Sequence, residues 1–270
     1  MQDKTIKIQA KRLNKRVLDL NKQTPDAECL AVATELDQLA DIYREQNQTE
    51  PAKSLFEQAL TIRKKVHTTN YHPDIANGLY KLASICHEQK AYVKSDLLYK
   101  QALTIREKTL GKEHPDVATI YFNLGRLNHS LKDYEQAETY YKRALTICEN
   151  HHGKQHKSVA TVLSNLALLA DDQDDYDQAK HLHEQALTIR KTVLGMQHPD
   201  VAFSIWHIAA WHADQNDNNR AQPLYKQALE IYEQVCPPDN TNLCQCLEEY
   251  NELLADMEKS KGWLRKLLKF

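Results

Sequence analysis

One four-residue motif returns along most of this chain at a nearly fixed spacing. The motif is Ala-Leu-(Thr/Glu)-Ile, and its copies begin at Ala59, Ala102, Ala144, Ala186 and Ala228. The last four copies lie 42 residues apart, and the first gap is one residue longer. Other markers keep the same register, namely His72, His114, His156 and His198, and Gly111, Gly153 and Gly195. A repeat of this length predicts a solenoid, in which each unit packs on the next.

Each repeat is expected to form two helices, as residues 114–155 illustrate. Pro115 and Asp116 suit the first turn of a helix, because proline lacks an N–H that would be unpaired there and a carboxylate favours the positive end of the helix. We expect this helix to end near His129 and a second helix to run from Tyr134. Apolar residues recur at steps of three and four along the first helix: Val117, Ile120, Tyr121, Leu124 and Leu127. This period favours helices over strands.

Small residues recur at three places in the repeat where two helices would have to approach closely. The first place holds Ala40, Ala83, Gly125, Ala167 and Ala209. The second holds Ala52, Ser95, Ala137, Ala179 and Ala221, and the third is the alanine that opens the repeated motif. A large side chain at any of them is expected to overpack the helix pair, at a cost of about 1–3 kcal/mol.

These patterns resemble the tetratricopeptide repeat, in which small residues, alanines and an aromatic residue recur across a helix pair. Residues 102–118, ALTIREKTLGKEHPDVA, are similar to the repeats of kinesin light chains and their bacterial relatives. The resemblance covers about residues 31–257. It implies an all-α fold, an α-α superhelix or solenoid of about five such helix pairs with N-terminal and C-terminal capping helices.

The chain divides into three parts on this basis. Residues 1–28 are expected to form an N-terminal capping helix, running from about 5 to 22. The repeat array is expected at 29–257 and a C-terminal amphipathic basic helix at 258–270. The repeats within the array are expected at about 31–71, 72–113, 114–155, 156–197 and 198–239, followed by a half repeat at 242–257.

The composition excludes several other classes of protein. The formal net charge is −2, so there is no overall positive field that would attract nucleic acid. No apolar run is long enough to span a membrane, and the N-terminal residues lack the apolar stretch of a secretory signal. We therefore expect a cytoplasmic protein or, alternatively, a bacterial protein delivered into a host cytosol. The six cysteines are expected to be reduced and packed.

No arrangement of residues predicts catalysis or a cofactor. The sequence has no glycine-rich phosphate loop and no nucleophile elbow. Most of the thirteen histidines follow the repeat, and those of the His-Pro-Asp motifs lie one repeat apart, too far to share an ion. His181 and His183 are expected to point in different directions, because residues two apart do not share a helix face. We therefore expect no enzyme activity, no cofactor and no metal site.

The resemblance implies that the first helix of each pair lines a concave groove that binds a peptide or protein segment. Asn123 and Asn165 match the family position whose asparagine commonly hydrogen-bonds the backbone of a bound peptide. An amide suits this role because it can both donate and accept. The candidate groove residues are Tyr80, Lys81, Phe122, Asn123, Arg126, Ser164, Asn165, Trp206 and His207.

The remaining groove candidates are expected to supply specificity. Lys81 and Arg126 suit an acidic residue or a terminal carboxylate. Tyr80, Phe122 and Trp206 suit an apolar anchor. The match to the family is partial, because the asparagine position holds Gln38, Lys81 and His207 in the other repeats. The groove also turns acidic in the first repeat, at Asp37, Asp41 and Glu45.

The last residues differ from the repeats, and two interpretations of them remain open. They combine apolar and basic side chains on a short helix: Trp263, Leu264, Arg265, Lys266 and Leu267. One interpretation is a cap that covers the last apolar face of the solenoid. The other is a contact with an acidic membrane surface or a partner, and so short a segment with few cations would bind a membrane weakly.

The sequence therefore predicts a non-enzymatic adaptor or scaffold that binds a protein or peptide ligand. It is similar to the cargo-binding part of kinesin light chains. Residues 1–28 hold no sustained heptads, so the coiled coil that joins those proteins to the motor subunit is not expected here. The alternative hypothesis is a regulatory or sensor module, including a bacterial effector-type mimic, whose C-terminal helix contacts a membrane or a partner.

Overall fold

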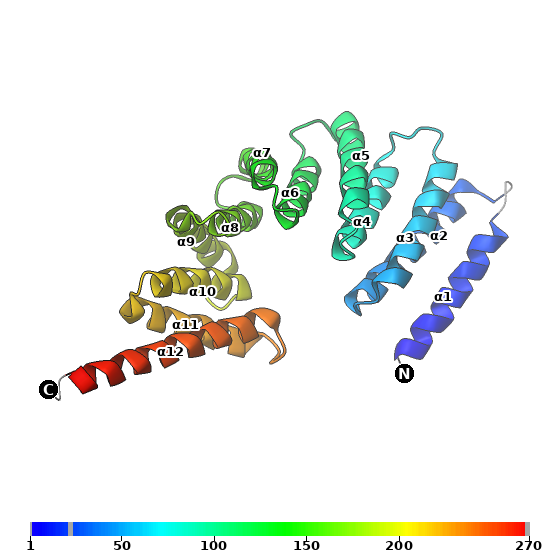
Figure 1. Cartoon of the computed structure of the whole chain (residues 1–270). Helices are drawn as coiled ribbons and strands as arrows, with labels where there is room; N and C mark the ends of the chain where they lie inside the picture. Colours follow the sequence, from blue (N-terminus) through cyan, green and yellow to red (C-terminus); the bar gives the residue numbers. More distant parts are fainter. Residues whose placement is uncertain (1, 21–23, 268–270) are drawn as a thin grey trace. The chain divides into compact units, whose positions relative to one another are not determined.

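The computed structural model describes residues 2–20 and 24–267, and within the helices it places the side chains of residues 10–13, 15–20 and 24–259. These residues form an all-α fold, as the sequence predicted (Figure 1). Its helices are α1 (Gln2–Asp19), α2 (Asp26–Glu45), α3 (Thr49–Val66), α4 (Pro73–Glu88), α5 (Tyr92–Leu110), α6 (Pro115–Ser130), α7 (Tyr134–His152), α8 (Lys157–Asp171), α9 (Tyr176–Leu194), α10 (Pro199–Asp214), α11 (Asn218–Val235) and α12 (Thr241–Leu267).

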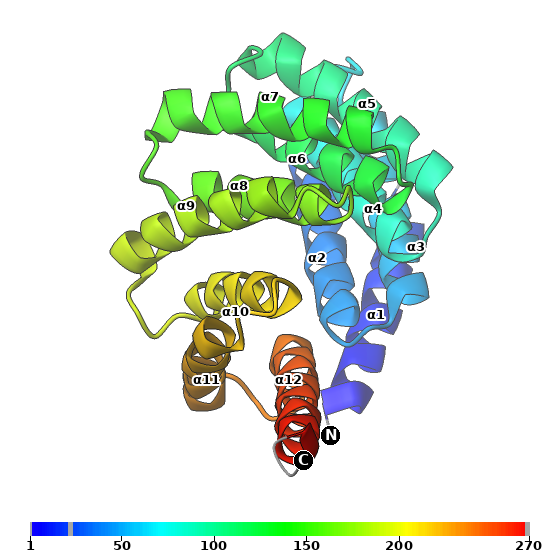
Figure 2. The ribbon, with the colours of Figure 1, turned by 60° about the vertical axis from the view of Figure 1, so that its left-hand side comes forward.

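From α2 to α11 the described helices form five consecutive antiparallel pairs, one for each predicted repeat (Figure 1). The backbone packs into two compact units, residues 1–147 and residues 148–270. Unit 1 contains α1 to α6 and most of α7, and unit 2 contains the end of α7 and α8 to α12. In unit 2, α12 packs against both α11 and α10 (Figure 2).

The terminal helices differ in extent from the sequence-based boundaries. α1 runs from Gln2 to Asp19 rather than from 5 to 22, and it packs on α2 with Leu13 buried. α12 is one continuous helix across residue 257, where the sequence suggested a boundary. None of the described helices combines the length and the apolar character that a membrane crossing requires.

The repeated histidines begin the first helix of their repeats. In each case the imidazole Nδ1 accepts the backbone N–H two residues later, at 3.1–3.2 Å, from Asp74, Asp116, Ser158 and Asp200. One of the unpaired N–H groups of the helix N-terminus is thereby satisfied. His72, His114, His156 and His198 therefore act as N-caps, a role that the repeat spacing alone did not reveal.

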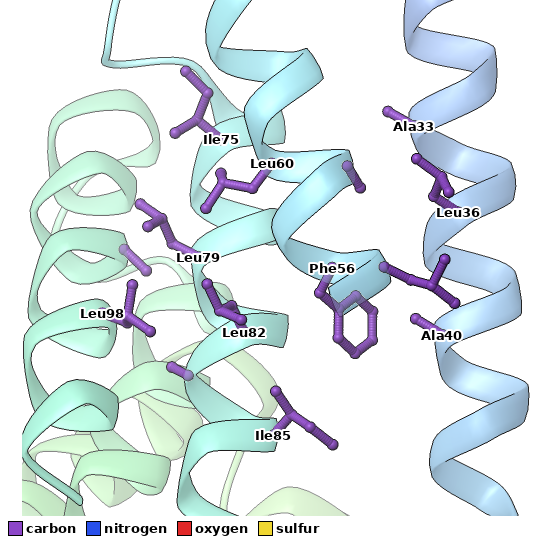
Figure 3. Packing of buried hydrophobic residues seen from close by; sticks show 14 of the residues in the cluster. Ala33, Leu36, Ala40, Phe56, Leu60, Ile75, Leu79, Leu82, Ile85 and Leu98 are labelled. Atoms are coloured by element: carbon purple, nitrogen blue, oxygen red, sulfur yellow. The ribbon is translucent and has the colours of Figure 1, made fainter. Parts of the chain in front are cut away.

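The core consists of apolar side chains that pack between successive helices around small residues. Figure 3 shows Phe56 of α3 facing Ala40 of α2, with Leu60 nearer to Leu79 of α4. All four of these residues are buried. An alanine lets the two backbones approach, and the adjoining ring fills the remaining space. This arrangement explains why the sequence repeats small residues at fixed places.

Gly125 shows how tight this packing is. A Cβ atom built at Gly125 would lie 2.6 Å from two ring carbons of Tyr141, which is fully buried on α7. We expect Gly125→Val to lower the free energy of unfolding by about 1–3 kcal/mol, because ring and helix would have to move apart. Thr119→Val is the control, because it also places a valine on α6 but at an exposed position, where the side chain it replaces is already β-branched. Urea unfolding of the two variants measures the difference, and equal midpoints would contradict the packing argument.

Candidate functional site

The first helices of unit 1 present a row of polar side chains that reaches from one repeat to the next. We call it the first-helix face of unit 1, formed by Asp41, Arg44, Tyr80, Lys81, Ser84, Asn123 and Arg126. Lys81 Nζ lies 2.6 Å from Asp41 Oδ2, and the Arg44 guanidinium pairs with Glu88 at 2.6 Å. These charges neutralise one another. Lys81, predicted as a carboxylate receptor, therefore already has a partner, and so does the acidic region of the first repeat.

Two of the candidate groove residues, Asn123 and Tyr80, are in direct contact. The Asn123 amide Nδ2 donates to the Thr119 carbonyl at 2.8 Å and to the Tyr80 hydroxyl at 3.2 Å. Both amide hydrogens are used in this way. Among the described residues no hydrogen bond reaches Asn123 Oδ1, although the residue as a whole is only 7% exposed. The side chain is thus fixed in position, and its free oxygen suits a ligand N–H.

Arg126 is the open cation of this face. It is exposed and makes no ion pair with any residue that the structure describes. Burial, together with the charge of Arg126, lowers the pKa of the neighbouring His87, so this imidazole is neutral near pH 7. Phe122, one turn away from Arg126, is half-buried, and its ring centroid lies 5.8 Å from that of Tyr141. An exposed guanidinium with an aromatic ring one turn away can bind an acidic and apolar segment.

A buried arginine behind this face was missed by the sequence analysis. Arg106 donates to Asn77 Oδ1 at 2.7 Å and to the Asp116 carbonyl at 2.8 Å, and its guanidinium carbon lies 5.3 Å from the centre of the Tyr80 ring. It thereby ties α5 to both α4 and α6. The available signal was the arginine that follows the repeated motif in three repeats: Arg63, Arg106 and Arg190. All three are buried.

In unit 2 the predicted groove residues are more enclosed. Ser164 is buried, and its hydroxyl has no partner among the described residues. Asn165 is half-buried and donates to the Thr161 carbonyl at 2.9 Å, as Asn123 does to Thr119. The asparagines of α6 and α8 therefore share one conformation, in which the amide N–H bonds its own helix.

Trp206 and His207 lie within a cluster of rings. Trp206 is 4% exposed, and its indole Nε1 donates to Glu249 Oε2 at 2.7 Å. The His207 ring lies 4.8 Å from the Trp206 ring and 4.4 Å from that of Phe203, and it stacks on His183 at 4.6 Å. Burial lowers the pKa of His207 to about 3, so it is neutral at pH 7. In this arrangement Trp206 docks α12 rather than offering an open anchor.

The C-terminal candidates lie at the end of α12. The backbone is helical from Trp263 to Leu267, but the side chains of Trp263, Leu264, Arg265, Lys266 and Leu267 lie outside the described residues. Both interpretations of this segment therefore stay predictions.

Antiparallel helix pairs that repeat about every 42 residues, with the second helix of one pair packed on the first helix of the next (α3 on α4, α5 on α6, α9 on α10), define a solenoid repeat protein. The sequence model for the tetratricopeptide repeat matches residues 8–65, 74–150, 129–192 and 158–234. The chain belongs to the tetratricopeptide repeat family, as the sequence pattern predicted. Domains of this family generally bind protein partners, and the fold is typically non-enzymatic.

Solved structures show where the fold recurs. The chain resembles BtubC (BKLC) from P. vanneervenii, with 24% identity and a TM-score of 0.69 over 87% of this chain and 92% of that one. It also resembles kinesin light chain repeats from Podospora anserina, with 23% identity and a TM-score of 0.62 over 74% and 95% of the two chains. Aspartyl phosphate phosphatase F from Bacillus subtilis shares 16% identity, with a TM-score of 0.72 over 93% of this chain and 64% of that one. Among curated proteins none matches the chain. The structural neighbours thus include kinesin light chain-like proteins, and at these identities the likeness concerns the fold.

Proposed function

We propose that the chain is a non-enzymatic adaptor that binds an extended segment of a partner protein on its first-helix faces. The observation that carries the proposal is membership of a family whose domains generally bind protein partners. An extended segment offers backbone N–H groups to fixed acceptors, and the free oxygen of Asn123 is such an acceptor. The role resembles that of the cargo-binding repeats of kinesin light chains.

The charges of unit 1 indicate which segment would bind best. Lys81 and Arg44 are already paired with carboxylates, whereas Arg126 is exposed without an ion pair among the described residues. An acidic side chain or a terminal carboxylate of the partner would therefore pair with Arg126. Phe122, one turn away, would receive an apolar residue. We propose an acidic segment with one large apolar residue as the ligand.

The double variant Asn123→Ala, Arg126→Ala tests this proposal. We expect it to weaken binding at least tenfold, which corresponds to about 1.4 kcal/mol, because a backbone hydrogen bond and a charge-assisted one are lost. The wild-type protein is used to select peptides from a displayed library. Fluorescence anisotropy then gives the affinity of the best peptide for each variant.

The matched control is Arg143→Ala, which removes an arginine from α7 that pairs with Glu113 and lies outside the first-helix face. We expect its affinity to equal that of the wild type. Asn165→Ala, in unit 2, reports separately whether that unit takes part. Binding that survives the double variant but is lost in the control would place the ligand elsewhere and defeat the proposal.

A further inference from the structure

Three possible metal ligands converge in unit 2, one from each of three consecutive helices. Asp171 ends α8, His183 lies on α9 and His207 lies on α10. One ligand atom from each, a ring nitrogen or a carboxylate oxygen, lies within 4.8 Å of the others. His183 Nε2 is 3.7 Å from Asp171 Oδ2, and the two imidazole rings are stacked with an interplanar angle of 6°. Figure 2 shows the three helices as neighbours.

His183 is unsatisfied in this arrangement. Its side chain is almost fully buried, and neither ring nitrogen has a hydrogen-bond partner in the part of the chain that the structure describes. Buried polar atoms in folded proteins nearly always have partners, because an unpaired one costs about 1–3 kcal/mol. His183 Nε2, which faces Asp171, therefore lacks a bonding partner that would offset the free-energy cost of its desolvation.

The repeat itself does not require either histidine. Where α9 has His183, the equivalent positions of the other second helices hold buried rings without a ring nitrogen: Phe56, Tyr99, Tyr141 and Tyr225. Where α10 has His207, α6 and α8 have Asn123 and Asn165. Any aromatic ring would fill the space at 183. The His207 position also varies in the first two repeats, which have Gln38 and Lys81, but the His183 position holds a histidine in this repeat alone, where its ring meets that of His207. This points to a chemical role for the nitrogens.

We propose that Asp171, His183 and His207 bind a divalent transition-metal ion of the zinc class. Imidazole nitrogen and carboxylate oxygen are usual ligands for zinc, whereas calcium and magnesium prefer oxygen alone. Bonds of about 2.1 Å require ligand atoms within roughly 4 Å of each other, close to the present spacing of at most 4.8 Å. The two imidazole rings, now stacked, would turn so that a lone pair of each points to the ion. Three protein ligands leave a fourth position for water or for a side chain of a bound protein.

Two charged side chains, Arg190 and Asp214, lie near this site. Arg190 lies nearby, but its guanidinium is held by the Ser204 hydroxyl at 2.7 Å and the Asp200 carbonyl at 3.2 Å. A second carboxylate, Asp214, lies close enough to Asp171 for the two charges to interact, and burial together with Asp171 raises its pKa.

The repeat supplies variants that keep the fold. His183→Phe and His207→Asn each install the residue type that other repeats carry at that position. Isothermal titration with ZnCl₂ is expected to show one site in the wild type, and the double variant is expected to bind zinc at least tenfold more weakly. Asp171→Asn is expected to weaken binding in the same direction. Zinc is also expected to raise the melting temperature of the wild type but not of the double variant.

Two controls separate this site from other histidines. His181→Asn changes an exposed histidine on the same helix α9. His72→Asn disrupts the other possible cluster, formed with His67 and Asp74, while keeping a good N-cap residue. We expect both controls to bind zinc as the wild type does. Zinc affinity that is unchanged in the double variant, or lost only in His72→Asn, would overturn the proposal.

Discussion

We expect Asp37→Ala to lower the free energy of unfolding by about 3–5 kcal/mol, the cost of leaving a buried charge without its partner. Arg63 donates to Asp37 at 2.8 Å, and both residues are at most 7% exposed. The pair joins α2 to α3 at the first repeat of unit 1. Without the carboxylate, the guanidinium would remain buried next to apolar side chains, since Arg63 makes no other ion pair among the described residues.

Asp41→Ala is the matched control for this prediction. Asp41 lies one turn further along α2 and pairs with Lys81 at 2.6 Å, but both side chains are partly open to solvent. We expect a loss of at most about 1 kcal/mol there, because solvent screens such pairs. Guanidinium chloride unfolding of the two variants gives both values.

A compensating variant tests the cause of the loss. Asp37→Leu combined with Arg63→Met removes both charges and fills their volume, and we expect it to recover most of the lost stability. Equal stability of Asp37→Ala and Asp41→Ala would show that the Asp37 pair is not effectively buried.

The repeat made the fold predictable from the sequence. Apolar residues at steps of three and four specify helices, and a 42-residue period specifies that each helix pair packs on a copy of itself. The helix pairs therefore follow from the sequence with bounds close to those observed. The small residues follow as well, since Gly125 and Ala40 stand where rings approach a helix.

The side-chain pairings were not predictable in the same way. They join residues of neighbouring helices and depend on how far each helix is rotated, which a periodicity does not report. Lys81 was predicted to bind a ligand carboxylate but pairs with Asp41 from the preceding first helix. His183 was compared only with His181, its neighbour in sequence, whereas its spatial neighbours are Asp171 and His207. Aligning each position across the repeats would have singled out His183 as the exception.

Trp206 illustrates the same limit and has the second large expected effect. We expect Trp206→Ala to lower the free energy of unfolding of the protein by about 3–5 kcal/mol, because a large buried ring is replaced by a cavity. The loss extends to α12, since the Trp206 indole and the Tyr225 hydroxyl both donate to Glu249, at 2.7 and 3.1 Å. Without Trp206 this half-buried carboxylate keeps only the Tyr225 hydroxyl as a donor among the described residues.

Trp211→Ala is the control for this prediction, because Trp211 lies on the same helix and is only half-buried, with Lys180 Nζ 3.8 Å from its ring centre. We expect a smaller loss there. Hydrogen exchange of the backbone amides of α12 separates a local effect from a general loss of stability. We expect Leu243–Leu253 to exchange faster in Trp206→Ala than in Trp211→Ala when the two variants are compared at equal free energy of unfolding. Equal exchange rates would mean that Trp206 does not hold α12, and would restore it as a candidate ligand anchor.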